Sequence, residues 1–279
     1  MHKLKQIKQT INMKKCIGFI LIFIVLLLAF YPQSNIVRAS ASDSPMLALV
    51  IDDFGGYERD GVDKILSITE PMTCAVIPLC ENSDSDMQRA KAAGHEVILH
   101  MPMEAHVRLP ENWYGNIVIR NGDSDEIVKQ KLDKAVETMP EVKGANIHIG
   151  SGVSKNKRVM KAIYDYMKNK NMFFLDSRTI LNGVCEDVCK TNNITYLGRD
   201  VFLEADKNRS YNAVIGNLKE ACEIAKEQGY AVAIGHVGKE GGENTADAII
   251  NMLPSIKEMG IKIVPLSEVY KKIDNTKQI

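Results

Sequence analysis

Short apolar runs alternate with longer amphipathic segments along most of this chain. The runs are typical of strands buried on both faces, and they cover residues 47–51, 72–77, 96–99, 145–148, 172–175, 194–197, 230–234 and 262–264. Segments with helical spacing of apolar residues lie between them, among them 84–93, 124–138, 155–168, 211–228 and 244–258. This alternation predicts a parallel sheet with crossover helices. The predicted fold is α/β, a distorted (β/α) barrel with seven or eight parallel strands in a single domain.

The first 41 residues depart from this alternation. Residues 1–15 contain five lysines and no acidic residue, and residues 16–31 are an unbroken apolar run. Small residues follow at Val37, Ala39 and Ala41. Such a segment predicts a secretory signal peptide, or a membrane anchor if it is not cleaved. We therefore expect residues 42–279 to form a secreted or membrane-anchored domain outside the cytoplasm, which touches the membrane only through the N-terminal segment.

Charge and cysteine content narrow the class of protein. The chain has 35 basic and 35 acidic residues, but residues 1–38 hold six of the basic ones and none of the acidic ones. The remainder carries 29 positive and 35 negative charges, a formal −6. No basic stripe is left to favour nucleic acid as a partner.

Five cysteines follow the N-terminal segment, an odd number that excludes complete pairing within the chain, and we assign them no catalytic role.

Two adjacent carboxylates, Asp52 and Asp53, end the first apolar run and precede Phe54 and two glycines. The carboxyl end of a buried strand is where α/β folds place their chemistry. Like charges this close raise one of the two pKa values unless a cation lies between them, which suggests one metal ligand and one general base. The plainer interpretation is that Asp53 caps the following helix, but two consecutive acids exceed what a cap requires.

Polar side chains follow four other strand-like runs at the same structural point. They are His100, His148, Asp176 and His236. In a parallel barrel all of these strand ends face one mouth. A single histidine there is usually structural, whereas three histidines together with three carboxylates favour a hydrolytic metal site with an open coordination position.

The sequence around these positions resembles one particular family. Eight segments between residues 47 and 270 are similar, in order, to those of the divergent polysaccharide deacetylase family, a branch related to the chitin and peptidoglycan deacetylases: VIDDFGG, TCAVIP, GHEVILHMPME, GANIHIGS, FFLDSRT, DVFLE, AIGHV and IVPLSEVY. The resemblance implies a distorted (β/α) barrel and a divalent metal, most often zinc. It also implies an N-acetylated glycan, peptidoglycan or a similar polymer, as the partner.

The resemblance further implies roles for individual residues. It makes Asp52 the general base, and it makes Asp53 and His100 metal ligands. Where the family has its second metal-binding histidine, four residues after His100, this chain has Glu104. The third ligand is then either Glu104 or His148 from the next strand. We favour the set Asp53, His100 and His148.

His236 matches the general acid of the family, which gives the leaving amine its proton. A nearby carboxylate such as Asp176 favours the protonated form of His236. Arg178 either holds Asp176, which is the plainer role, or binds a substrate oxygen. Trp113 and Tyr114, in the loop after the third strand-like run, either stack on a sugar ring or plug the core.

Two functions from different classes fit these residues. The first is an exported metal-dependent hydrolase that removes N-acetyl groups from a cell-envelope polysaccharide. The alternative is a non-catalytic carbohydrate-binding or envelope-assembly protein on the same barrel. Asp52 and His236 favour the enzyme, because a binding protein needs neither a base nor an acid.

Overall fold

The computed structural model describes residues 44–205 and 209–277. These residues belong to one compact unit. The predicted signal peptide or anchor, residues 1–41, lies outside the described residues. Across the described ranges, no helix has both the length and the apolar character that crossing a membrane requires.

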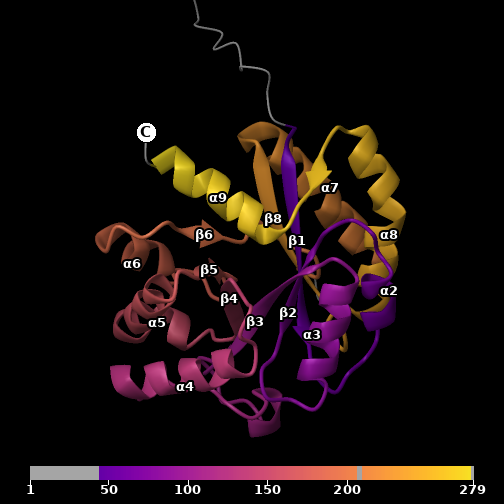
Figure 1. Ribbon diagram of the computed structural model, residues 1–279. Coiled ribbons are helices and arrows are strands. Elements are labelled where there is room, and N and C mark those ends of the chain that lie inside the picture. The colour runs from indigo at the N-terminus through magenta and orange to yellow at the C-terminus, as the bar shows by residue number, and fades with distance from the viewer. Residues whose placement is uncertain (1–43, 206–208, 278–279) are drawn as a thin grey trace, which may run out of the picture. The chain divides into compact units, whose positions relative to one another are not determined.

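A parallel sheet forms the centre of the fold (Figure 1). Its strands are β1 (Met46–Phe54), β2 (Thr73–Val76), β3 (Glu96–Met103), β4 (Gly144–Ile149), β5 (Phe173–Asp176), β6 (Leu197–Gly198), β7 (Val201–Phe202), β8 (Tyr230–His236) and β9 (Lys262–Ile263). Eight of these described strands follow the order β6-β5-β4-β3-β2-β1-β8-β7, and β9 pairs with β1. The strands pair in parallel. This curled sheet confirms the predicted distorted (β/α) barrel.

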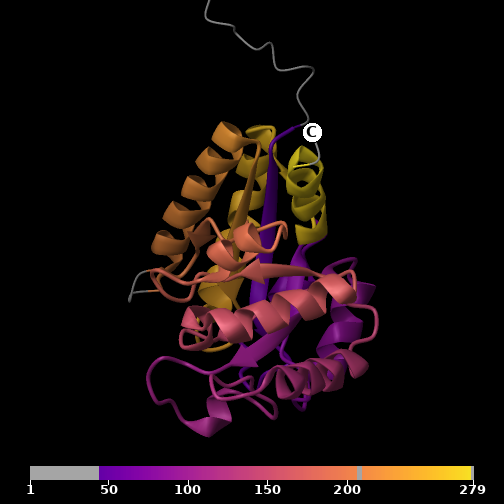
Figure 2. The same ribbon diagram turned by 90° about the vertical axis from the view of Figure 1, so that its left-hand side faces the viewer.

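Helices connect the strands and cover the outside of the sheet (Figures 1 and 2). They are α2 (Val62–Leu66), α3 (Ser83–Ala92), α4 (Asp125–Glu137), α5 (Lys157–Asn169), α6 (Cys185–Thr191), α7 (Tyr211–Gln228), α8 (Gly242–Glu258) and α9 (Leu266–Lys277), with 3₁₀ turns η1 (Glu111–Trp113) and η2 (Val153–Lys155). Ser124, Asn156 and Ser210 cap α4, α5 and α7, because each side chain accepts a backbone N–H three residues further on. The five helices expected from apolar spacing correspond to α3, α4, α5, α7 and α8.

Alternate residues of each strand point to opposite faces of the sheet, and both faces are buried. One set of side chains packs against the surrounding helices, and the other fills the interior of the barrel. The interior cluster includes Ala48, Val50, Ala75, Ile98, Leu175, Val232 and Ile234. Leu266 and Val269 of α9 belong to this cluster, and α9 lies across the sheet near the end where β1 begins (Figure 1). That end of the barrel is therefore closed, and the mouth is at the carboxyl ends of the strands.

Candidate metal and catalytic site

An irregularity at the end of β1 brings both acids of the pair to the mouth. Neighbouring residues of a regular strand point to opposite faces, so a regular β1 would separate Asp52 from Asp53. The register of β1 against β2 shifts between Ile51 and Phe54, where three steps on β1 match two on β2. This extra residue is a β-bulge. Asp53 also has a φ of 70°, a left-handed conformation that is uncommon outside glycine.

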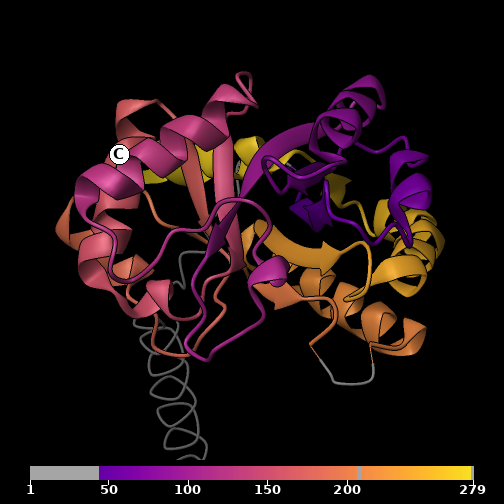
Figure 3. The ribbon, with the colours of Figure 1, turned by 90° about the horizontal axis from the view of Figure 1, so that it is seen from below.

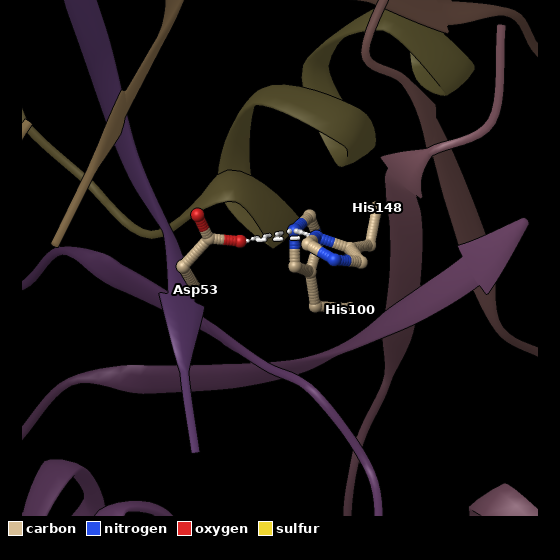
Figure 4. A group of neighbouring side chains, drawn as sticks. All are labelled: Asp53, His100 and His148. Atoms are coloured by element: carbon tan, nitrogen blue, oxygen red, sulfur yellow. Dashed lines mark hydrogen bonds and ion pairs between the residues drawn. The ribbon is translucent and has the colours of Figure 1, made fainter. Parts of the chain in front are cut away.

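Asp53, His100 and His148 come together at the mouth from β1, β3 and β4 (Figure 4). Asp53 Oδ1 lies 3.2 Å from His100 Nε2 and 3.0 Å from His148 Nδ1. The two ring nitrogens are 3.1 Å apart. Of the two candidates for a third ligand, the structure places His148, and not Glu104, in this group.

The other nitrogen of each imidazole has its own partner, which determines where its proton lies. Asn146 donates its amide N–H to Asp52 Oδ1 at 2.8 Å, because a carboxylate only accepts. The amide oxygen of Asn146 therefore faces His100 Nδ1, 2.7 Å away, and accepts its proton. His148 Nε2 lies 2.9 Å from the backbone carbonyl oxygen of Trp113 and donates to it. In the neutral rings, His100 Nε2 and His148 Nδ1 thus present lone pairs to the same point.

This arrangement fits a divalent cation. Three lone pairs 3.0–3.2 Å apart repel one another, and Asp53 Oδ1 is a buried oxygen without a hydrogen-bond donor. Ligands at ~2.0–2.1 Å from a tetrahedral zinc ion lie about 3.3 Å from one another, and such a three-residue set leaves the fourth position open.

Asp52 lies beside this group and has different contacts. Its Oδ2 is 3.8 Å from His100 Nε2 and 4.0 Å from His236 Nε2. Asp52 is almost completely buried, and this burial raises its pKa although His100 and His236 oppose the rise. A buried carboxylate with a raised pKa, facing a group of side chains that could hold a metal ion, is suited to accept a proton.

His236 ends β8 opposite Asp52 and is paired with Glu204. Its Nδ1 lies 3.0 Å from Glu204 Oε2, and its backbone N–H donates to Glu204 Oε1 at 3.0 Å. The hydroxyl of Thr245 donates to the same Oε1 at 2.5 Å. Burial acts to lower the pKa of His236, but Glu204 outweighs it and raises that pKa to about 10. The ring is therefore protonated at neutral pH.

Asp176 does not have the role that the sequence suggested. It was expected to favour the protonated form of His236, but its carboxylate accepts the backbone N–H of Arg178 and the hydroxyl of Tyr196, each at 2.9 Å. The guanidinium of Arg178 donates to that hydroxyl and to the backbone carbonyl of Arg199. Arg178 thus holds Asp176 through its own backbone and through Tyr196. The carboxylate that pairs with His236 is instead that of Glu204, in the segment after β7.

The loop after β3 contains the other three residues singled out from the sequence. Glu104 Oε2 accepts the backbone and side-chain N–H groups of Asn121 at 2.8 and 2.9 Å, so Glu104 holds this loop in place. Tyr114 is only 3% exposed, and its hydroxyl accepts the backbone N–H of Ala105. It therefore plugs the core. Trp113 is 51% exposed.

Sequence reasoning missed the contacts made by Asn146 and Glu204. Asn146 precedes His148 by two residues, and strand alternation places both on one face, so a usable signal was present. Glu204 follows the two-residue strand β7, which is too short to be predicted from periodicity. The segment DVFLE, which resembles the family, ends at Glu204, but it did not mark Glu204 as the partner of His236.

Residues 49–270, which include every site residue described above, match the model of the divergent polysaccharide deacetylase family. Because this match covers most of the chain, the chain belongs to that family. The resemblance found in the eight sequence segments is therefore confirmed.

Individual relatives support the same family and fold. An uncharacterized protein of Haemophilus influenzae is 28% identical over 216 residues, which are 77% of this chain and 72% of that protein. The uncharacterized protein YibQ of Escherichia coli is 30% identical over 190 residues, which are 68% of this chain but only 58% of YibQ. The crystal structure of an uncharacterized Agrobacterium tumefaciens protein has a TM-score of 0.72 at 19% identity, covering 82% of this chain and 91% of the other. At that identity the likeness shows the fold alone.

Proposed function

We propose that this chain is a metal-dependent hydrolase that removes N-acetyl groups from a polysaccharide of the cell envelope. The observation that carries the proposal is the convergence of Asp53, His100 and His148 on one point, with Asp52 and His236 beside it. Membership of the family favours an N-acetylated glycan, peptidoglycan or a similar polymer, as the substrate. A proton acceptor and a proton donor next to a metal-binding group favour catalysis over binding alone.

Asp53, His100 and His148 are the proposed metal ligands. One oxygen and two imidazole nitrogens with a fourth position open favour zinc. When bound, such an ion polarises the acetyl oxygen and lowers the pKa of a water molecule. Asn146 and the carbonyl of Trp113 orient the two imidazoles by accepting protons from the nitrogens that face away from the ion.

Asp52 and His236 are the proposed proton acceptor and proton donor. Asp52 Oδ2 takes a proton from the attacking water, and His236 Nε2 gives one to the leaving nitrogen as the C–N bond breaks. The products are acetate and a free amine on the sugar. Glu204 is a positioning residue, because it fixes the ring of His236 and keeps it protonated.

We also propose that residues 1–41 export the barrel, as a cleaved signal peptide or as an anchor, so that residues 42–279 are secreted or anchored outside the cytoplasm. The basic start and the apolar run that follows it support this. The proposed substrate, a glycan of the cell envelope, agrees with this proposed export.

Acetate release from peptidoglycan and from chitin oligomers tests the proposed activity. We expect the purified protein to release acetate, to stop when a chelator removes the metal, and to resume when zinc is added. Asp53→Ala should lose both the bound metal and the activity, whereas Asp84→Ala on the exposed side of α3 should lose neither. Protein that binds metal and glycan but releases no acetate would contradict the enzyme and favour a carbohydrate-binding protein.

A further inference from the structure

Trp113 is the single tryptophan of the chain, and it is linked directly to the metal-binding group. It ends η1 in the loop after β3. Its backbone carbonyl accepts the Nε2 proton of His148, the ligand contributed by β4. The backbone of Trp113 therefore orients a proposed metal ligand, while the residue itself is 51% exposed.

The indole also contacts the segment that follows β8, the strand that ends in the proposed general acid. Lys239 follows His236 by three residues, and its Nζ lies 5.8 Å from the centre of the Trp113 ring. Figure 3, which looks toward the mouth, shows the loop after β3 reaching across to the segment after β8. Trp113 therefore lies at the rim between the metal ligand of β4 and the acid of β8.

The contacts of the loop hold the indole in this position. Tyr114, the next residue, is buried and bonded to the backbone of Ala105. Arg120 pairs with Glu111 at 2.5 Å, the first residue of η1. A side chain that only plugged the core would be buried as Tyr114 is. Trp113 instead stays half exposed, with the ammonium of Lys239 over its ring, next to the proposed reaction centre.

We propose that the Trp113 indole is a stacking platform for the pyranose ring of an N-acetylated sugar whose acetamide group lies at the Asp53–His100–His148 centre. The C–H face of a pyranose is apolar, so it packs on an aromatic face while the hydroxyl groups at its edge stay solvated. The stacked sugar displaces the exposed ammonium of Lys239, a weak contact. This inference rests on the proposed function, because it assumes that an N-acetylated glycan reaches the centre.

The single tryptophan gives a direct test, since the tryptophan fluorescence of the full, metal-loaded chain arises from Trp113 alone. We expect a saturable change in emission when an N-acetylglucosamine tetramer is added. The matched glucosamine tetramer, which lacks the acetyl groups, should produce a much weaker change. An emission spectrum that no N-acetylated oligomer alters would overturn the inference.

Substitutions separate stacking from a structural role. Trp113→Phe should keep most of the affinity, and Trp113→Ala should raise the dissociation constant of the tetramer about tenfold, both measured by calorimetry. The carbonyl that contacts His148 belongs to the backbone, so the metal content should stay the same in both variants. Leu181→Ala, at an apolar residue that is 87% exposed in the loop after β5, serves as the control and should bind like the wild type.

Three outcomes distinguish this inference from the proposed function. Acetate release by the wild type, with equal affinity for the tetramer in Trp113→Ala, overturns stacking and leaves the hydrolase proposal standing. A saturable emission change without acetate release supports stacking and counts against the hydrolase. Loss of metal in both Trp113→Phe and Trp113→Ala overturns stacking and assigns Trp113 to the positioning of His148.

Discussion

Replacing Glu204 with glutamine should lower the pKa of His236 with little change in the shape of the site. The amide is almost the same size as the carboxylate. With its oxygen in the Oε2 position it still accepts the Nδ1 proton of His236, but its NH2 group then takes the Oε1 position and the backbone N–H of His236 loses its acceptor. The hydroxyl of Thr245 can rotate to suit the new partner. The change therefore removes the negative charge beside the imidazole and one backbone hydrogen bond of His236.

The geometry gives the magnitude of that charge effect. His236 Nδ1 and Glu204 Oε2 are 3.0 Å apart, and the side chains are 12% and 1% exposed. Opposite charges at this separation attract by about 5 kcal/mol at an effective dielectric constant of ~20. The rise in the pKa of His236 from 6.5 to about 10 corresponds to about the same energy, at ~1.4 kcal/mol per unit. Asp52 and Asp53 keep part of the rise in the variant, so we expect the pKa to fall by about 2 units.

A titration of the imidazole signals by NMR, on metal-free protein, measures this pKa directly. A His236→Gln variant assigns the signal. In the wild type the pKa should lie at about 10, so at pH 9 about nine-tenths of the ring is protonated, against about one-tenth in Glu204→Gln. If His236 is the general acid, acetate release by the metal-loaded variant should fall about tenfold at pH 9 and change little at pH 6.

The same substitution should alter the pH dependence of stability. Because the pKa of His236 is higher in the folded state, its contribution to the free energy of unfolding is complete below pH 6.5 and is lost as the pH rises toward about 10. Urea unfolding should therefore show Glu204→Gln most destabilised at pH 6 and least at pH 10. Glu223→Gln, on the exposed face of α7, is the control. An unchanged pKa of His236 in Glu204→Gln would refute the reasoning.

Three further predictions concern the base, the amide behind the metal ligands, and export. Asp52→Asn should keep its metal while acetate release falls ~10²–10⁴-fold; unchanged release would contradict its role as the general base. Asn146→Ala removes the acceptor for the Nδ1 proton of His100, so its zinc affinity should fall about 10–100-fold in competition with a chelating dye, and equal affinity would contradict the orienting role. A reporter fused after residue 45 should lie outside the cytoplasm, and a cytoplasmic reporter would contradict the predicted signal or anchor.

The sequence predicted the scaffold because buried parallel strands leave a strong local signal. Apolar runs identified eight of the nine described strands, although the run at 194–197 overlaps β6 only at Leu197. The eight include the three strands that carry Asp53, His100 and His148. The exception is β7, whose two residues are too few to show a period. Missing β7 had a direct consequence for the site, because Glu204 follows it. The sequence favours Asp176 instead, at the end of the more visible β5, as the carboxylate beside His236.

The details of the site depend on contacts between segments that are distant in the sequence, and these leave no periodic signal. Nothing in the strand alternation shows that β1 bulges before Phe54, yet without the bulge Asp52 and Asp53 would point to opposite faces. Asn146 shows the same limit, because its position is predictable but its bonds to Asp52 and His100 join three strands. A buried amide that donates to one group and accepts from another ties the proposed base to a proposed metal ligand. Replacing Asn146 should therefore affect metal affinity and proton transfer together, whereas Asp52→Asn should affect proton transfer alone.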